Sequence, residues 1–256
     1  MREGSVNSEL NGKVALVTGA GRGLGRGIAI ELAKNGCKVF LNYKINYEAA
    51  LSTKQEIAAF NGIAELVPAD MSKREDVARL FDQISAAGRL DFLINNAGVN
   101  RRSTFMETSD ADWDFVLDTN LKGPFMASQE AFRIMEKQKF GRIINISSIS
   151  GQNHGPKTVH YAVSKAGLNS LTKVLARYGA PNGILVNAIA PGIIPTEQTE
   201  TELNSEGGRA YLDQTLLKSF GTVEDVSAAV LFLVSKSGSY ITGQVISVAG
   251  GAYLGS

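Results

Sequence analysis

Cysteine and histidine are nearly absent from this sequence of 256 residues. Cys37 is the sole cysteine, so the chain has no internal disulfide and no thiolate cluster for a metal ion. The two histidines, His154 and His160, are too few for an ordinary zinc site built from histidine. A lone thiol also suits a reducing compartment. We therefore expect chemistry that uses no bound metal.

An excess of charge of one sign and a long apolar run are also missing. Lysine and arginine total 26 against 25 acidic residues, so no overall field favours nucleic acid or a membrane surface. No segment approaches the ~20 apolar residues of a membrane span. The opening MREGSVNSEL lacks the apolar core of a signal peptide, and we interpret residues 1–10 as a flexible terminus. These features predict a cytoplasmic protein without nucleic-acid or membrane partners.

The chain does contain a regular alternation of short apolar runs with amphipathic stretches. Strands are expected at 13–19, 37–43, 63–70, 91–98, 141–148, 184–192 and 243–251. Helices are expected at 24–35, 47–60, 73–87, 109–137, 158–178 and 223–235. This alternation predicts an α/β fold, a Rossmann-type doubly wound parallel sheet of about seven strands flanked by helices. We expect one domain over residues 11–256, with an irregular substrate loop at 193–220.

A glycine-rich turn, TGAGRGLGRG, joins the first expected strand to the first expected helix. Its spacing is T-G-x-x-x-G-x-G, formed by Thr18, Gly19, Gly23 and Gly25. Such a turn lets backbone N–H groups and a helix N-terminus approach a pyrophosphate. A tight turn with a purely structural role is the alternative, which the position between strand and helix disfavours. The segment therefore predicts a dinucleotide site.

The second expected strand bears on the choice of cofactor. An acid about 20 residues after the glycines would hold the ribose 2′-hydroxyl of NAD. Here Tyr43 stands in that place, Lys44 follows, and Arg22 lies inside the glycine turn. Two cations and no carboxylate suit a 2′-phosphate, so we predict NADP(H), with NAD(H) as the alternative. Solvated surface charges are the other interpretation of Lys44 and Arg22.

The segment YAVSK places Tyr161 one helical turn before Lys165. A free tyrosine has a pKa near 10, and a neighbouring ammonium lowers the pKa by favouring the phenolate. Tyr161 could then give a proton to a carbonyl oxygen or take one from an alcohol. Ser148, upstream in NISSISG, could hydrogen-bond the same oxygen. The pattern indicates proton transfer at a carbonyl.

Together these motifs resemble the short-chain dehydrogenase/reductase family over residues 11–252. The resemblance also includes NNAG at 95–98 and the proline-glycine turn NAIAPGIIPT at 187–196. It implies a catalytic tetrad of Asn120, Ser148, Tyr161 and Lys165, in which the lysine also binds the nicotinamide ribose and the asparagine holds a water on the proton route. The implied enzyme is an NAD(P)-dependent oxidoreductase acting on CH–OH groups, in which the cofactor supplies hydride.

Motifs and resemblance together assign a set of residues to the cofactor. In this family Asp70 would contact the adenine ring, and Thr196 the nicotinamide end. The predicted cofactor-binding residues are Thr18, Gly19, Gly21, Arg22, Gly23, Leu24, Gly25, Tyr43, Lys44, Asp70, Met71, Asn96, Ala97, Gly98, Tyr161, Lys165, Pro191, Gly192, Ile194 and Thr196.

The segments GRIINISSISG, YAVSKAGLNSLTK and YITGQVISVAGG are most similar to the 3-oxoacyl-(acyl-carrier-protein) reductases of fatty-acid biosynthesis. That likeness implies reduction of a 3-oxoacyl thioester carried on acyl carrier protein or coenzyme A. The sequence departs from that of these reductases at Tyr178-Gly179, Asn182, VAGG and FGTVEDV. Two alternative functions therefore stay open. One is a dehydrogenase of a sugar, polyol or steroid alcohol. The other is a regulator that senses NADP(H) without turnover, which the complete tetrad disfavours.

Other residues receive structural or open interpretations. We interpret His160 as a packing or surface residue, Trp113 as a core or interface residue, and Ser164 and Cys37 as structural. His154 could line the substrate mouth. An acidic carrier protein would need cations near that mouth. Candidates are Arg101, Arg102, Lys137, Lys139 and Arg142, with a solvated face as the alternative. The resemblance implies a homotetramer or a dimer, built on the helices expected at 109–137 and 158–178.

Overall fold

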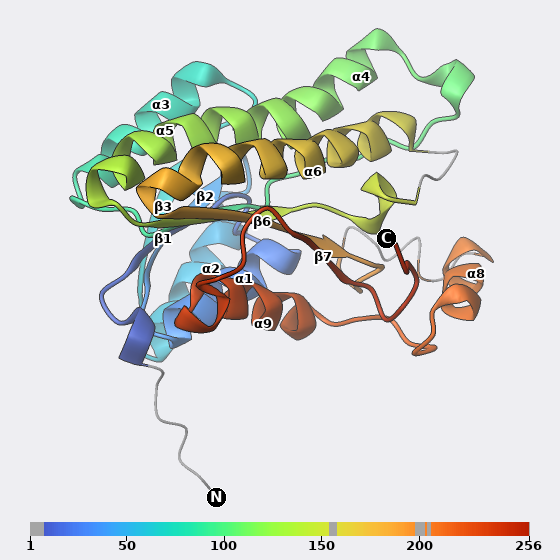
Figure 1. The fold of residues 1–256 in the computed structure, drawn as a ribbon. Helices are drawn as coiled ribbons and strands as arrows, with labels where there is room; N and C mark the ends of the chain where they lie inside the picture. The colour runs from blue at the N-terminus through green and yellow to red at the C-terminus, as the bar shows by residue number, and fades with distance from the viewer. Residues whose placement is uncertain (1–7, 154–157, 198–202, 204–205, 256) are drawn as a thin grey trace, which may run out of the picture.

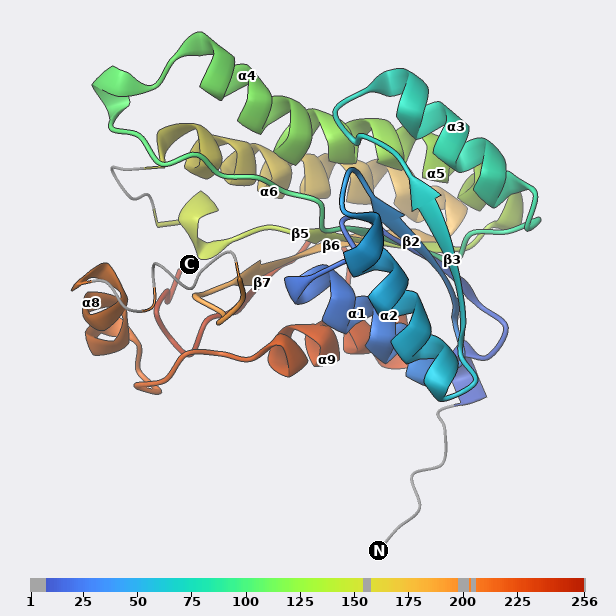
Figure 2. The same cartoon turned by 180° about the vertical axis from the view of Figure 1, so that it is seen from behind.

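The computed structural model describes residues 8–153, 158–197, 203 and 206–255. Within them the chain forms a seven-stranded sheet in the order β3-β2-β1-β4-β5-β6-β7. All six neighbouring pairs are parallel. Helices cover both faces of this sheet, as Figures 1 and 2 show from opposite sides. The predicted doubly wound α/β fold is confirmed.

The predicted strands are confirmed, each somewhat shorter than its expected range. Strands β1, β4 and β5 are buried throughout and largely apolar on both faces, because helices cover both. The strands are β1 (Val14–Val17), β2 (Lys38–Tyr43), β3 (Ile63–Pro68), β4 (Phe92–Asn95), β5 (Gly141–Ile146), β6 (Ile184–Pro191) and β7 (Val245–Val248).

Two layers of helices enclose the sheet (Figure 1). One layer holds α1 (Gly23–Lys34), α2 (Tyr47–Ala59) and α9 (Val223–Val234). The other holds α3 (Arg74–Ser85), α4 (Asp110–Leu117), α5 (Gly123–Gln138) and α6 (Val159–Gly179). Each layer packs its own apolar cluster against the sheet. In α3, for example, Val77, Leu80, Phe81 and Ile84 follow a helical period and are all buried.

The helix predicted over residues 109–137 is interrupted. Asp118–Lys122 forms a π-helical turn between α4 and α5, which widens the helix by one residue. Periodicity alone does not reveal such a turn, because the apolar pattern continues across it. The turn carries Asn120, a member of the predicted tetrad.

Two other expected segments differ in detail. The loop expected at 193–220 contains a helix, α8 (Glu206–Gln214), which lies beside the C-terminus in both ribbon views. Of the terminus predicted to be flexible, residues 1–7 lie outside the described residues, whereas Ser8–Leu10 form a 3₁₀ turn with Leu10 buried in the core. His154, considered for the substrate mouth, also lies outside the described residues.

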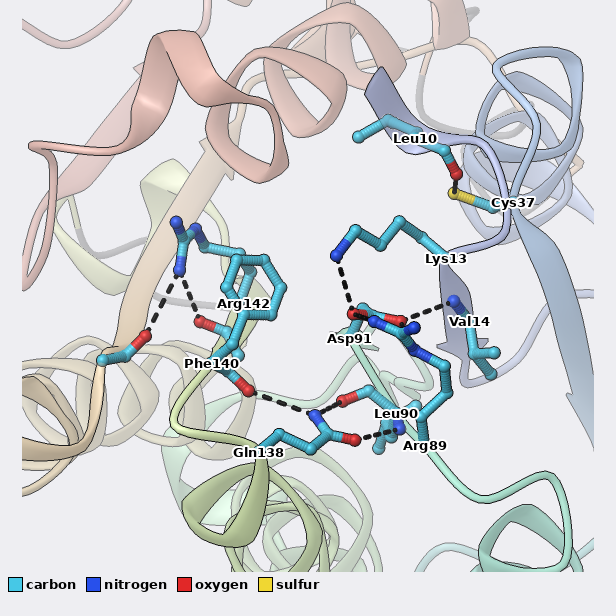
Figure 3. A network of polar contacts seen from close by, with 12 residues as sticks. Leu10, Lys13, Val14, Cys37, Arg89, Leu90, Asp91, Gln138, Phe140 and Arg142 are labelled. Atoms are coloured by element: carbon cyan, nitrogen blue, oxygen red, sulfur yellow. Dashed lines mark hydrogen bonds and ion pairs between the residues drawn. The ribbon is translucent and has the colours of Figure 1, made fainter. Parts of the chain in front are cut away.

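A charged network closes the edge of the sheet where the strands begin (Figure 3). Asp91 is fully buried just before β4 and accepts hydrogen bonds from Lys13, Arg89 and the backbone N–H of Val14. Arg142, at the start of β5, lies 4.6 Å from the centre of the Phe140 ring. Because parallel strands share one amino edge, Arg142 lies at the opposite end of β5 from the carboxyl ends, where doubly wound folds bind ligands. The structure thus removes Arg142 from the candidate cations at the site mouth.

Candidate active site at the carboxyl edge

A cavity of about 330 Å³ opens at the carboxyl ends of the strands. It lies at the point where the strand order reverses between β1 and β4, the usual ligand site of an open α/β sheet. Segments that follow β1, β2, β3, β4, β5 and β6 line it. The predicted residues that line it are Gly19, Arg22, Gly23, Leu24, Gly25, Lys44, Asp70, Met71, Asn96, Ala97, Gly98, Ser148, Tyr161, Lys165, Pro191, Gly192, Ile194 and Thr196.

The glycine turn is shaped so that side chains do not fit. Gly19 and Gly23 have φ angles of +65° and +53°, which favour glycine. A Cβ on Gly25 would lie 2.3 Å from the carbonyl oxygen of Gly19, so that position excludes any other residue. Helix α1 begins at Gly23 and directs its N-terminal N–H groups at the cavity. These features fit a dinucleotide pyrophosphate.

Thr18, Gly21 and Tyr43 lie outside the cavity lining. The Thr18 hydroxyl accepts hydrogen bonds of 2.9 Å from the backbone N–H groups of both Asn96 and Ala97. Thr18 therefore fixes the segment after β4, which itself lines the cavity. The Tyr43 ring packs edge-on against Tyr47, with ring centres 5.9 Å apart. A direct cofactor contact by these residues stays a prediction.

Asn42 is a cavity residue that the sequence analysis missed. It is buried at the end of β2, and its side-chain oxygen accepts a 3.2 Å hydrogen bond from Gly19 N–H. Its amide group donates to the carbonyls of Val67 and Ala69. Asn42 thus ties the glycine turn to two strands. A buried amide inside the apolar run CKVFLNY was the available signal.

Further lining residues were also not predicted. They are Ala69, Val99, Thr119, Ile146, Ser147 and Glu197. Most are small or apolar residues that flank predicted ones, so residue type gave no signal for them.

Each cation predicted to hold a 2′-phosphate lies beside a carboxylate. Lys44 Nζ lies 2.7 Å from Asp70 Oδ2, and Arg22 Nη1 lies 3.7 Å from Glu197 Oε2. Burial opposes the charge on Asp70, but hydrogen bonds from Lys44 and Ser72 outweigh it and lower the pKa of that carboxyl. A phosphate on the ribose would have to share Lys44 with Asp70.

Tyr161 and Lys165 both line the cavity from α6. The Lys165 side chain is almost fully buried, and its Nζ donates a 2.7 Å hydrogen bond to the carbonyl of Ile146 at the end of β5. Its Nζ also lies 5.6 Å from the centre of the Tyr161 ring. Burial lowers the pKa of Lys165 to about 8. The predicted pair therefore shares one space.

The neighbouring serines of NISSISG, Ser147 and Ser148, have different hydrogen-bond partners. Ser147 Oγ lies 2.6 Å from Asn169 Oδ1 and 3.3 Å from the carbonyl oxygen of Lys165, so its single hydroxyl hydrogen is engaged by acceptors on α6. Ser148 caps a short 3₁₀ turn by accepting from Ser150 N–H at 3.0 Å. The hydroxyl hydrogen of Ser148 is not used in that cap, so it remains able to donate to a substrate oxygen.

Asn120 is fully buried and does not line the cavity. Its side-chain oxygen accepts from Val99 N–H at 2.8 Å, and its amide donates to the carbonyl of Val99 at 2.8 Å and to Ser164 Oγ at 3.2 Å. Both amide hydrogens are therefore bonded to protein atoms. This arrangement lets Asn120 hold Val99, which does line the cavity. That Asn120 holds a water on the proton route stays a prediction.

The turn after β6 supplies the other wall of the cavity. A Cβ on Gly192 would lie 2.0 Å from the Tyr211 hydroxyl, so α8 packs closely on this turn. Tyr211 stacks on Phe220, with ring centres 6.0 Å apart. Part of the expected substrate loop thus contacts residues that line the cavity.

His160 is fully buried beside Tyr161, as the packing interpretation expected. Burial lowers its pKa, and its Nε2 has no hydrogen-bond partner. Among the residues that the structure describes, no group of histidine, cysteine, aspartate or glutamate could hold a metal ion. Within the same residues, no helix is long and apolar enough to cross a membrane.

Comparisons with known proteins agree with this geometry. A family described as enoyl-(acyl carrier protein) reductase matches residues 19–253. A 3-oxoacyl-(acyl-carrier-protein) reductase of Aquifex aeolicus is 42% identical over 96% of this chain and 99% of its own. A 3-oxoacyl-(acyl-carrier-protein) reductase of Staphylococcus aureus is 42% identical over 94% of this chain and 98% of its own.

Solved structures show the same fold. A putative gluconate dehydrogenase from Agrobacterium tumefaciens has a TM-score of 0.93 and 33% identity, covering 97% of this chain and 98% of its own. A putative 2-deoxy-D-gluconate 3-dehydrogenase from the same organism, solved with bound NADP, has a TM-score of 0.89 and 35% identity, covering 96% and 98%. With this match and a cavity that fits a nicotinamide dinucleotide, the chain belongs to the short-chain dehydrogenase/reductase family and is an oxidoreductase.

Proposed function

We propose that the protein reduces the ketone of a 3-oxoacyl thioester, held on acyl carrier protein, to a secondary alcohol with NADPH. The observation that carries the proposal is the meeting of Ser148, Tyr161 and Lys165 in one cavity with the glycine turn. The relatives named as 3-oxoacyl-(acyl-carrier-protein) reductases, alike over nearly the whole chain, support the substrate class.

In the proposed reaction the nicotinamide cofactor supplies hydride to the carbonyl carbon. The Ser148 hydroxyl holds the carbonyl oxygen by hydrogen bonding. Tyr161 donates its phenolic proton to that oxygen as negative charge develops. Lys165, fixed by the Ile146 carbonyl, stabilises the phenolate that remains on Tyr161.

The preference for NADPH is part of the proposal. Lys44 and Arg22 both line the cavity, and no acid stands at the end of β2 to hold a ribose 2′-hydroxyl. A phosphate dianion can draw Lys44 away from Asp70 because it carries more charge than one carboxylate. Fluorescence titration with NADPH and NADH tests this, and equal affinities would contradict it.

A second candidate is oxidation of a sugar or polyol alcohol by the same residues. The observation that favours it is the close fold match to the two putative dehydrogenases of gluconate and 2-deoxy-D-gluconate. Steady-state assays with NADPH and acetoacetyl thioesters, beside NADP⁺ or NAD⁺ with polyols and sugar acids, separate the two candidates. Absence of turnover with any thioester would contradict the first candidate.

We further propose that the protein acts in the cytoplasm as a homotetramer. Helices α5 and α6 leave large apolar side chains exposed, which a second copy could cover. These side chains are Phe125, Val163, Val174 and Tyr178. Light scattering tests the assembly, and a monomer at micromolar concentration would contradict it.

A further inference from the structure

Ser164 contributes a fully buried hydroxyl between Tyr161 and Lys165 on α6. Its Oγ donates a 2.7 Å hydrogen bond to the backbone carbonyl of Tyr161 and accepts a 3.2 Å hydrogen bond from Asn120 Nδ2. One oxygen atom therefore joins the π-helical turn that carries Asn120 to the helix that carries the proposed proton donor.

The other bonds of Asn120 run away from α6. Its oxygen and its second amide hydrogen both bond the backbone of Val99, after β4. The described bonds thus form a chain from the Val99 carbonyl through Asn120 and Ser164 to the Tyr161 carbonyl. Removing the Ser164 hydroxyl would break this chain at its contact with α6 and leave a buried N–H unpaired, a costly state.

Helix propensity gives no reason for serine at this position. Serine is disfavoured inside helices relative to alanine, because its hydroxyl competes for backbone groups. A site that required only packing would be filled equally well by alanine. The buried hydroxyl is accounted for by its bond to Asn120.

We propose that Ser164 is a positioning residue for the carbonyl reduction. It sets the placement of Asn120 and Val99 relative to Tyr161 and Lys165, and thereby aligns the proton-transfer step. The inference builds on the proposed function, which assigns Tyr161 as proton donor. Ser164 itself does not line the cavity.

The same helix offers a matched control. Thr172 is also fully buried on α6, where its hydroxyl donates to the Leu168 carbonyl at 2.8 Å and accepts from Asn145 Nδ2 at 2.9 Å. It makes the same two kinds of bond as Ser164, but its partner Asn145 bonds Asn95, which lies outside the cavity lining, whereas Asn120 bonds Val99, which lines the cavity. Replacements Ser164→Ala and Thr172→Val therefore remove equivalent bonds, of which only the first leads to a residue that lines the cavity.

The test compares these two variants with the native chain. For Ser164→Ala we expect kcat to fall about tenfold, because small misplacements of reacting groups are costly, while the Kd for NADPH stays within about twofold. We expect the pH profile of kcat and its solvent isotope effect to change in this variant. For Thr172→Val we expect the pH profile of kcat and the solvent isotope effect to match those of the native protein. Ser164→Cys, which keeps the size of the side chain, replaces Ser164→Ala if the latter does not fold.

Two results would overturn the inference. One is a kcat for Ser164→Ala within about twofold of the native value, and the other is an equal loss of kcat in Thr172→Val. If the native protein turns over no carbonyl compound, the proposed function fails. Crystal structures then decide the inference separately: an Asn120 amide that moves away from its native position in Ser164→Ala supports positioning, and an unmoved amide overturns it.

Discussion

The ammonium group of Lys165 lies 5.6 Å from the centre of the Tyr161 ring and donates a hydrogen bond to the carbonyl of Ile146. That bond anchors the lysine to the end of β5, so its charge is fixed in position. A fixed charge stabilises a phenolate more effectively than a mobile one, because no reorganisation is needed during reaction.

Replacement Tyr161→Phe should abolish most of the reduction. We expect kcat to fall by about 10²–10⁴, the usual contribution of a positioned proton donor, with the Kd for NADPH little changed. Steady-state assays and fluorescence titration measure the two quantities. Tyr178→Phe is the control, because Tyr178 is 60% exposed on the same helix. Full activity of Tyr161→Phe would contradict the assignment.

The pH dependence should report the buried lysine. Burial lowers the pKa of Lys165 to about 8, so its charge is present below that pH and is lost above it. We therefore expect kcat/KM for reduction, which reflects the free enzyme, to decrease as the pH rises through this value. In Lys165→Arg the guanidinium stays charged, so the decrease should move to higher pH even if the rate is lower. Identical pH profiles of kcat/KM for the native protein and Lys165→Arg would contradict the assignment of this decrease to Lys165.

Replacement Lys44→Ala tests how the 2′-phosphate is recognised. We expect the Kd for NADPH to rise about tenfold, equivalent to ~1.4 kcal/mol, while the Kd for NADH changes little. Asp70→Asn should have the opposite effect on selectivity, because it releases Lys44 for the phosphate. Lys73→Ala, at an exposed position outside the cavity lining, serves as the control. An equal rise of the Kd for NADPH and the Kd for NADH in Lys44→Ala would refute a contact between Lys44 and the 2′-phosphate.

The amino-edge network in Figure 3 should matter for stability and not for the reaction. We expect Asp91→Asn to lower the free energy of unfolding by about 1–3 kcal/mol, because bonds from Lys13 and Arg89 to a buried carboxylate weaken. Urea unfolding measures this change, and kcat should stay unaltered. Glu56→Gln, which breaks the half-exposed pair with Arg26, should cost at most about 0.5 kcal/mol. An unchanged urea midpoint for Asp91→Asn would contradict the prediction.

Local patterns were sufficient for most of the fold. The central strands were recognisable because both faces are buried and largely apolar, and the helices because one face is apolar. The glycine turn was also recognisable from the spacing of its glycines. The structure explains that spacing, because a Cβ on Gly25 would collide with the carbonyl of Gly19. The interruption by the π-helical turn at Asp118–Lys122 was not readable, because a one-residue widening leaves the apolar period intact.

The sequence by itself determined the doubly wound fold, the glycine turn and the pairing of Tyr161 with Lys165, since each depends on residues close in the chain. Tertiary structure decided the roles of side chains whose partners are distant. Thr18 bonds the segment after β4, Asn42 holds the glycine turn, and Ser164 reaches Asn120 across the fold. A hydroxyl or amide can bond many partners, and only the packing of strands and helices selects which one it meets.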